Sequence, residues 1–238
     1  MVQTRARADA GAPADPFRGW PLLRDLAPAT TARFAARMRW SEVAPGQALV
    51  DFDDPTTDVF FVATGRVRIM IRGAGGQELI LEDIAAGGSF GEMAAIDGAP
   101  RSAAAMALNR SLIGRLPGQD FMRLAAEAPE VSRRLMRILV QRLRLMNERV
   151  LDLTTLDIRH RLYAELLRLA LPAQGGTRSI SPPPVQHILA NRIGARREPV
   201  SREIAQLSRT GLIRRTRGTL VLCEPEILEH RLAAARQK

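Results

Sequence analysis

A regular spacing of apolar residues between positions 136 and 153 constrains this chain more than any other feature. The residues follow one another at intervals of 3, 4, 3, 4 and 3, and they are Met136, Leu139, Leu143, Met146, Val150 and Leu153. This repeat places all six on one face of a helix, flanked by Arg and Glu, as in a coiled-coil seam. A core helix within one chain has the same pattern. The strict repeat and the charged flanks favour a helix that pairs with a second copy of the chain.

The sequence before this helix has a different texture. From Ala48 to Leu116, short β-rich runs alternate with Gly pairs and Asp clusters, which is typical of an antiparallel roll or barrel. Val67, Ile69 and Ile71 alternate with other residues at period two, as expected of a half-buried strand. The pattern becomes helical after Pro117, and a second apolar stripe is expected to pack the long helix on the β domain. This stripe consists of Leu135, Ile138 and Leu145.

Charge is distributed unevenly along the 238 residues. Residues 1–130 contain 14 Arg against 16 Asp and Glu, whereas residues 131–238 contain 21 basic residues against 9 acidic ones. A near-neutral front half joined to a basic back half indicates a sensor or scaffold fused to a polyanion binder. Nucleic acid is the first candidate partner and a membrane surface the second. No apolar run of about 18 residues and no secretory signal is present, so a cytoplasmic location without a membrane span is expected.

Metal and redox chemistry find little support in the residue types. The chain has one cysteine, Cys223, and three scattered histidines, at positions 160, 187 and 230. This excludes an intramolecular disulfide framework, a Cys-ligated iron–sulfur cluster and a multi-Cys zinc site, so no metal is expected. No P-loop lysine and no Ser/His/Asp spacing is present, which argues against an enzyme.

The segment from Ile188 to Ile204 predicts a helix-turn-helix. Ala190 is small where two helices must cross closely, and Gly194 can take the positive φ of a tight turn. Val200 is expected to anchor the second helix. The residues that follow, 212–222, predict a β-hairpin wing around a basic turn.

The polar face of the second helix predicts contacts to DNA bases. Arg can bind guanine through two hydrogen bonds and Glu can accept from cytosine, so Arg197, Glu198 and Arg202 are the candidate base readers. The candidates for phosphate contacts are Arg196, Arg209, Arg214, Arg215 and Arg217. An ordinary solvated helix face is the alternative. The spacing, the wing and the local charge together favour double-stranded DNA as the partner.

A second constellation lies in the β domain. Gly91 lets a backbone approach a ligand closely, and Glu92 can accept from sugar hydroxyls. Arg101 and Ser102 supply one charge and one hydroxyl, which together with backbone N–H groups make a compact anion cradle. A surface ion pair is the alternative interpretation of either dipeptide alone.

These motifs together resemble those of the CRP/FNR family. The pattern Phe-Gly-Glu at 90–92 and Pro-Arg-Ser-Ala at 100–103 is similar to a cyclic-nucleotide phosphate-binding cassette. A long helix and then Arg-Arg-Glu-Pro-Val-Ser-Arg at 196–202 follow it, and the resemblance covers roughly residues 22–236. It implies a homodimeric bacterial transcription factor that binds palindromic DNA with half-sites close to TGTGA and contacts RNA polymerase. The implied fold class is α+β, with an N-terminal jelly-roll-like β-roll, a long dimerisation helix and a C-terminal winged helix-turn-helix.

The resemblance also implies a ligand site. Glu92 would hold the ribose 2′-OH beside Gly91, while Arg101 and Ser102 would hold the cyclic phosphate. Met146 and Asn147 align with the residues that touch the purine, and Arg142 would lie beside the base. The resemblance makes cyclic AMP the first expectation. Because Met146 has no hydroxyl, cyclic GMP or no nucleotide are the alternatives. The missing cysteines and the lack of a suitable histidine argue against the iron–sulfur and haem branches of the family.

Four segments are therefore expected. Residues 1–20 form a disordered tail, 21–128 the cyclic-nucleotide-binding-like domain, 129–156 the dimerisation helix, and 157–238 the DNA-binding domain. A short helix or helix pair is expected between Leu22 and Met38, and residues 173–184 are expected to be a loop or hinge. The functional hypothesis is a nucleotide-gated regulator, and the rival is a constitutive DNA-binding protein of the same fold.

Overall fold

The computed structural model describes residues 17, 19–73 and 76–237, which form two compact units. The first contains the described residues up to Gly76 and from Ile80 to Gln141. The second contains Gln77–Leu79 and the described residues from Arg142 onward. Most of the predicted N-terminal tail, residues 1–16 and 18, lies outside the described residues.

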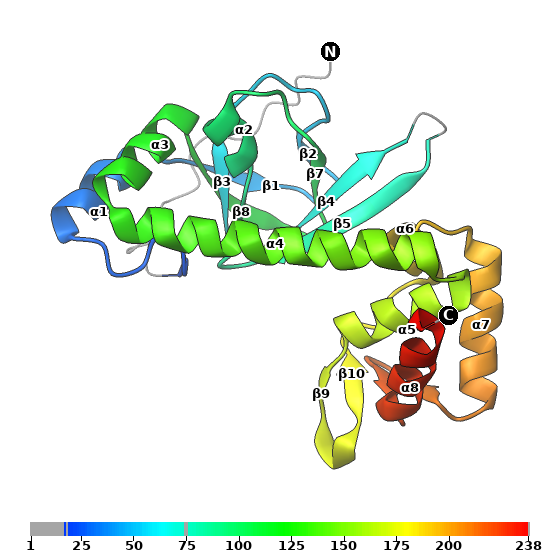
Figure 1. The fold of residues 1–238 in the computed structure, drawn as a ribbon. Helices are drawn as coiled ribbons and strands as arrows, with labels where there is room; N and C mark the ends of the chain where they lie inside the picture. The colour runs from blue at the N-terminus through cyan, green and yellow to red at the C-terminus, as the bar shows by residue number, and fades with distance from the viewer. Residues whose placement is uncertain (1–16, 18, 74–75, 238) are drawn as a thin grey trace. The chain divides into compact units, whose positions relative to one another are not determined.

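The first unit is built from two four-stranded sheets and flanking helices (Figure 1). Its strands are β1 (Arg39–Val43), β2 (Ala48–Val50), β3 (Val59–Thr64), β4 (Arg66–Arg72), β5 (Glu78–Ala85), β6 (Ser89–Phe90), β7 (Ala104–Ala107) and β8 (Ser111–Leu116). Its helices are α1 (Pro28–Ala35), α2 (Glu92–Asp97), α3 (Gly118–Glu127) and the first part of α4 (Pro129–Thr155).

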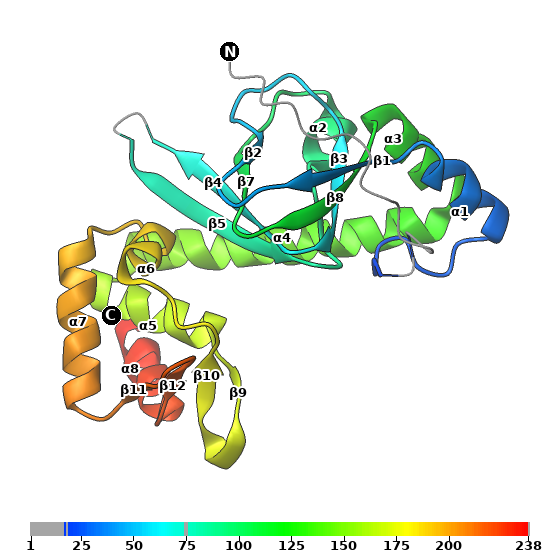
Figure 2. The ribbon, with the colours of Figure 1, turned by 180° about the vertical axis from the view of Figure 1, so that it is seen from behind.

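The two sheets have the strand orders β1-β8-β3-β6 and β2-β7-β4-β5 (Figure 2). The β1–β8, β3–β8 and β4–β7 pairs are antiparallel, with Phe61 opposite Gly114 and Val67 opposite Ala107. Apolar side chains from both sheets form one core, including Val43, Val50, Phe60, Val62, Val67, Ile84, Phe90, Ala105, Ala107 and Ile113. This arrangement confirms the predicted β-roll.

A second core joins the outer side of the first sheet to the helices. It includes Phe17, Trp20, Leu22, Leu23, Phe34, Phe61, Leu116, Phe121, Leu124 and Val131. Phe17 and Trp20 are 1% and 2% exposed, and the Trp20 indole donates to the carbonyl of Val62 at 3.1 Å. The end of the expected disordered tail is therefore part of the core. Each of these two aromatic rings removes a large apolar surface from water by packing there.

The short helix expected between Leu22 and Met38 is confirmed as α1, and strand β1 follows from Arg39. One local prediction in this unit was wrong. In β4, Met70 is buried and Ile71 only partly so, because both faces of the strand are packed. Arg68 is 8% exposed and forms two hydrogen bonds to Asp83, at 2.7 and 2.9 Å, which compensate its buried charge.

Helix α4 runs from Pro129 to Thr155. Leu135 lies in the core of the first unit, with Ile138 and Leu139 packed against it, so part of the predicted second stripe is confirmed. Leu139 is a seam residue in the sequence pattern, and it contributes to this packing as well. Three other seam residues, Met136, Leu143 and Val150, are 57%, 61% and 58% exposed in the single chain.

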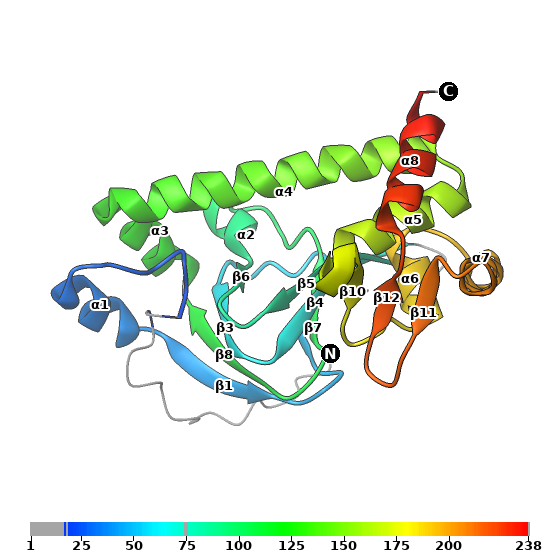
Figure 3. The same cartoon turned by 90° about the horizontal axis from the view of Figure 1, so that it is seen from below.

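The second unit is a helical domain with one small sheet (Figure 3). Its helices after α4 are α5 (Ile158–Leu169), the 3-10 turn η1 (Gln174–Gly176), α6 (Gln186–Arg192), α7 (Arg197–Arg209) and α8 (Pro225–Arg236). Its strands are β9 (Leu171–Pro172), β10 (Arg178–Ile180), β11 (Ile213–Arg215) and β12 (Leu220–Leu222), in the order β11-β12-β10-β9. The predicted wing is confirmed as β11 and β12.

The segment 173–184, expected to be a loop or hinge, is more ordered than that. Its strand β10 pairs with β12 and with β9, so it belongs to the wing sheet. The three residues of β10 are too few to show the period-two pattern of a strand, and the partner strand β12 lies about forty residues away.

A buried ion network stabilises the second unit. Glu165 on α5 is fully buried, and its carboxylate pairs with Arg168 and with Arg192, the latter at 3.3 Å. Asp152 near the end of α4 pairs with Arg168 at 3.0 Å and with Arg236 at 2.7 Å. These ion pairs join the last turns of α4 to α5, α6 and α8. A buried carboxylate is tolerated only when its charge is compensated, so both carboxylates need these arginine partners.

Candidate functional site

The first constellation begins where β6 turns into the short helix α2. Gly91 takes φ +88° at the first cap of α2, and Glu92 begins the helix. A Cβ built on Gly91 would lie 2.7 Å from the guanidinium of Arg101 and 2.8 Å from the carbonyl of Asp58. Only glycine fits this position, since it combines a left-handed backbone with close approach of a neighbouring side chain.

Arg101 is 4% exposed, and protein groups surround its guanidinium. Nη1 donates to the Gly91 carbonyl at 3.0 Å, and Nη2 donates to the Asp58 carbonyl at 2.8 Å. Two longer bonds, of 3.3 and 3.4 Å, reach the hydroxyl of Thr56. The guanidinium also lies 5.4 Å from the centre of the Phe60 ring, a cation–π distance.

The loop between β2 and β3 holds the backbone of Arg101. Its N–H donates to the Asp54 carbonyl and its carbonyl accepts from the Asp53 N–H, both at 2.9 Å. Asp53 has φ +64°, a left-handed conformation that Asp adopts more readily than most residues. The cassette is therefore fixed by two separate segments, the β2–β3 loop and the β6–α2 turn.

Electrostatics at this cassette are balanced around Arg101. Burial lowers the pKa of Arg101, and the charges of Asp54 and Asp58 oppose that shift. Partial burial raises the pKa of Asp54, but hydrogen bonds from Thr56 and the charge of Arg101 outweigh it, so its pKa is lowered overall. A carboxylate and a guanidinium that stabilise each other's charged forms keep a fixed positive centre beneath α2.

The other predicted ligand residues are distributed over both units. Glu92 is 5% exposed beside Gly91, whereas Ser102 is exposed, with its hydroxyl 3.8 Å from the sulfur of Met93. The structure thus brings Gly91 and Arg101 into direct contact. The three candidate base contacts lie on the part of α4 that belongs to the second unit, and they are Arg142, Met146 and Asn147. Arg142 and Met146 are half-buried and Asn147 is exposed in the single chain.

The helix-turn-helix of the second unit has the predicted geometry. Gly194 takes φ +60° between α6 and α7, and the N–H of Ala195 donates back to the carbonyl of Ala190 at 3.0 Å. Ala190 is 2% exposed where the two helices cross, and Val200 is fully buried beneath α7. Small residues at the crossing and an anchored second helix leave the opposite face of α7 open to solvent.

The predicted DNA contacts lie on that open surface. Arg196 directly precedes α7, Arg197 and Glu198 form the first turn of α7, and Arg202 follows one turn later, all of them exposed. The exposed arginines of the wing region are Arg214, Arg215 and Arg217, and Arg209 ends α7. One unit thus presents a helix face and a wing that both carry positive charge, which suits a polyanion.

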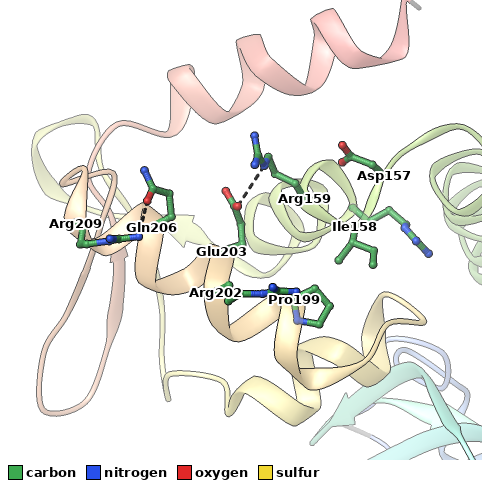
Figure 4. A pocket seen from close by; sticks show the side chains of 9 residues that line it. Asp157, Ile158, Arg159, Pro199, Arg202, Glu203, Gln206 and Arg209 are labelled. Atoms are coloured by element: carbon green, nitrogen blue, oxygen red, sulfur yellow. Dashed lines mark hydrogen bonds and ion pairs between the residues drawn. The ribbon is translucent and has the colours of Figure 1, made fainter.

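A groove of about 780 Å³ lies between the start of α5 and one side of α7 (Figure 4). Its lining residues are Asp157, Ile158, Arg159, Arg161, Pro199, Arg202, Glu203, Gln206 and Arg209. The side chains of Arg159 and Glu203 face each other across it, and the Arg209 guanidinium donates to Gln206 at 2.7 Å.

Sequence reasoning missed several residues of these sites. Thr56, Asp58 and Phe60 surround Arg101 from β3 and the loop before it, more than forty positions away. Tyr163 and Glu203 join α5 to α7 in the same way. No local sequence pattern marked them, because each contact joins segments that are distant along the chain.

Comparison with known families agrees with both sites. A family profile described as "Cyclic nucleotide-binding domain" matches residues 40–128, and one described as "Crp-like helix-turn-helix domain" matches residues 160–231. A nucleotide-binding-type β-roll joined to a helix-turn-helix defines a DNA-binding transcriptional regulator, not an enzyme.

Similar proteins make the family explicit. The chain is 30% identical to the cyclic AMP receptor protein of Thermus thermophilus, over 90% of this chain and 97% of that one. It is 25% identical to the "CRP-like cAMP-activated global transcriptional regulator" of Mycobacterium tuberculosis, over 88% and 95%. A CooA mutant from Carboxydothermus hydrogenoformans shares the fold at TM-score 0.74 and 20% identity, over 88% and 92%. The chain belongs to the CRP/FNR family of transcriptional regulators.

Among the described residues, no helix has the length and apolar character that crossing a bilayer requires. No group of three or more His, Cys, Asp or Glu side chains among the same residues could hold a metal ion.

Proposed function

We propose that this regulator is a homodimer whose affinity for a palindromic DNA operator is controlled by a cyclic nucleotide, with cyclic AMP as the first candidate. The observation that carries the proposal is the contact between Gly91 and Arg101, a buried cation held against a backbone that only glycine permits. A cyclic phosphate needs one fixed positive charge and close backbone approach. The names of the relatives from Thermus and Mycobacterium support cyclic AMP.

Each residue of the cassette has a role in this proposal. Arg101 and Ser102 bind the cyclic phosphate, and Glu92 accepts from the ribose 2′-OH beside Gly91. The Thr56 hydroxyl holds Arg101 only through bonds of 3.3 and 3.4 Å, so an anion can replace them at small cost. Arg142, Met146 and Asn147 of α4 contact the purine.

Dimerisation through α4 completes the proposal. The exposed seam residues Met136, Leu143 and Val150 would be buried against a second copy, as the heptad spacing predicts. Two copies then present two α7 helices to successive major grooves, about 34 Å apart on one face of the DNA. We expect half-sites close to TGTGA, read by Arg197, Glu198 and Arg202, with phosphate contacts from Arg196 and from the wing. RNA polymerase is the expected protein partner, and the cytoplasm the expected location.

Gating requires that the nucleotide binds the two forms of the regulator with different affinity. A ligand that touches both the cassette and α4 meets this condition, because its contacts depend on where α4 lies. Helix α4 is thus the element whose position the nucleotide changes, and α7 is moved with it.

A second candidate function has one observation in its favour. Met146 lacks the hydroxyl expected beside a purine. This feature suits a constitutive DNA-binding regulator whose β-roll binds no nucleotide, or one that responds to cyclic GMP. Both variants of the proposal keep the same DNA interface.

Calorimetry distinguishes these candidates. Cyclic AMP and cyclic GMP are titrated separately into the purified chain, and we expect saturable heat with cyclic AMP. Arg101→Leu should abolish this heat, whereas Arg110→Leu, a loss of the same charge at an exposed ion pair with Glu42, should leave it unchanged. Heat with cyclic GMP alone would change the assigned nucleotide. No heat with either nucleotide would leave the constitutive regulator as the conclusion.

A further inference from the structure

A carboxylate lies on the buried side of the recognition helix α7. Glu203 follows Val200 by three residues and precedes Leu207 by four, and those two residues are 0% and 1% exposed. This spacing places all three on the same side of the helix. The Glu203 side chain is only 12% exposed, so its charge requires partners to compensate for lost hydration.

Both partners of Glu203 come from α5. The phenol of Tyr163 donates to Oε1 at 2.5 Å, and Nε of Arg159 pairs with Oε2 at 3.2 Å (Figure 4). Tyr163 is 1% exposed and belongs to the core of the second unit. The two carboxylate oxygens are therefore held by two different side chains, one buried and one at the edge of the groove.

The phenol remains a donor over the whole pH range used for DNA-binding experiments. Burial raises the pKa of Tyr163 to about 12, with a further increase from Glu203 and a partial decrease from Arg231. Hydrogen bonds to an ionised acceptor are the stronger kind, and their strength depends on direction. Apolar contacts such as those of Val200 and Leu207 depend much less on direction, so they fix the distance of α7 from the core better than its rotation.

Rotation of α7 decides which side chains reach a base pair. Arg202 directly precedes Glu203, and Glu198 lies five positions earlier on the same helix. A helix turns by about 100° per residue, so each side chain of α7 projects in its own direction. A small rotation of α7 about its axis therefore displaces the tips of Arg202 and Glu198 together. A guanidinium that must form two hydrogen bonds to one guanine tolerates little displacement.

We propose that Glu203 is a positioning residue for base recognition. Held by Tyr163 and Arg159, it sets the rotation of α7 and thereby the direction in which Glu198 and Arg202 point. This inference rests on the proposed base-reading role of those two residues. It concerns specificity, not overall affinity for DNA, because Glu203 itself faces α5.

The test measures discrimination between two duplexes. The full-length wild-type chain first enriches a preferred duplex from a random library, with and without cyclic AMP, and a scrambled duplex of equal composition serves as reference. The measured quantity is the Kd for the scrambled duplex divided by the Kd for the preferred one. We expect Glu203→Ala to lower this ratio roughly tenfold and Tyr163→Phe roughly threefold, with little change in the Kd for the scrambled duplex.

Two further variants separate positioning from general stability. Glu203→Gln keeps an acceptor for the Tyr163 phenol, so it should retain more of the ratio than Glu203→Ala. Glu229→Gln makes the same chemical change on α8, where the Glu229 side chain is 46% exposed and pairs with Arg178 of β10. This control variant should leave the ratio unchanged. Thermal unfolding of each variant reports folding independently of DNA.

The outcomes are distinct. An unchanged ratio for Tyr163→Phe, which removes a single oxygen atom, would overturn the inference even if Glu203→Ala does not fold. Equal weakening of both duplexes by Glu203→Ala would also overturn it, because that is the signature of a loss of stability. A wild-type chain that enriches no preferred duplex would instead contradict the proposed function.

Discussion

At the residue scale, Gly91 and Arg101 depend on each other. The guanidinium occupies the space that a side chain at Gly91 would need, and its bond to the Gly91 carbonyl holds it there. This dependence explains why a glycine with φ +88° stands beside a buried arginine. The pair can therefore be tested without touching Arg101 itself.

Gly91→Ala should weaken cyclic-nucleotide binding by at least about tenfold, because the new Cβ displaces Arg101 and a left-handed alanine costs roughly 1–2 kcal/mol. Calorimetry measures the affinity. Gly98→Ala is the matched control, since Gly98 caps the other end of α2 at φ +72° but has no atom within 4 Å of the added Cβ. Equal loss of affinity in both variants would attribute the effect to backbone strain alone.

The DNA-facing residues allow a second residue-scale prediction. Glu198→Ala should reduce discrimination at one base pair by about 1–3 kcal/mol, whereas Arg215→Ala should weaken binding to all sequences alike. Competition binding with single base-pair changes in the preferred duplex measures both effects. If Glu198→Ala lowers affinity for random and preferred DNA to the same extent, Glu198 does not read a base.

The sequence predicted the motif residues of the sites but not their surroundings. Gly91, Arg101 and the polar face of α7 were identifiable because each belongs to a motif with a fixed spacing of residue types. Thr56, Asp58 and Tyr163 were not, because their partners lie forty or more residues away along the chain. A pairing that exists only in the folded state leaves no local pattern.

At the element scale, α5 begins at a side-chain cap. The carboxylate of Asp157 accepts from the backbone N–H of His160 at 2.9 Å and lies 2.8 Å from the His160 ring nitrogen. Partial burial raises the pKa of Asp157, but the hydrogen bonds from His160 outweigh this effect, so the pKa is lowered from its usual value of 3.8. This cap starts the helix to which α7 is joined through Glu203.

Asp157→Ala should destabilise the folded chain by about 0.5–2 kcal/mol near neutral pH, as loss of an N-cap does. Because the folded-state pKa is lowered, the stabilisation is complete above the unfolded-state pKa and is lost as the pH falls through the folded-state value. Urea unfolding at about pH 7 and about pH 3 should therefore show a difference between wild type and variant that shrinks in acid. Asp157→Asn keeps an acceptor and should lose less; a pH-independent difference would contradict the role of the carboxylate.

The longest helix was predictable from its sequence pattern, whereas several short elements were not. Helix α4 runs from Pro129 to Thr155 against an expected 129–156, because its apolar repeat continues over many turns. Strand β1 and the pair β9–β10 were missed, since each is only two to five residues long and is stabilised by a distant strand. The burial of Phe17 and Trp20 was missed because two aromatic residues among Ala, Pro and Gly have no period.

At the scale of the whole molecule, α4 is the element on which the proposed dimerisation depends. Its seam residues Met136, Leu143 and Val150 are exposed in the single chain, and burial of a leucine side chain is worth about 1.5–3 kcal/mol. The neighbouring surface of α4 carries Arg and Glu, which suits a solvated flank. An isolated chain would leave this apolar surface in contact with water.

Leu143→Glu should weaken the dimer by at least about tenfold, because it brings two carboxylates into an apolar seam. Sedimentation equilibrium over a range of chain concentrations measures the change. Gln141→Glu adds the same charge two positions away on an exposed part of α4, outside the seam, and should leave the dimer intact. A wild-type chain that sediments as a monomer at every concentration would rule out the seam.

The most direct test of nucleotide control is the affinity of the wild-type chain for its preferred duplex, measured by fluorescence anisotropy with and without cyclic AMP. We expect the nucleotide to lower the Kd for this duplex by about tenfold or more, while the Kd for a scrambled duplex changes little. The same Kd in buffer alone, with cyclic AMP and with cyclic GMP would contradict nucleotide control and leave a regulator that binds DNA constitutively.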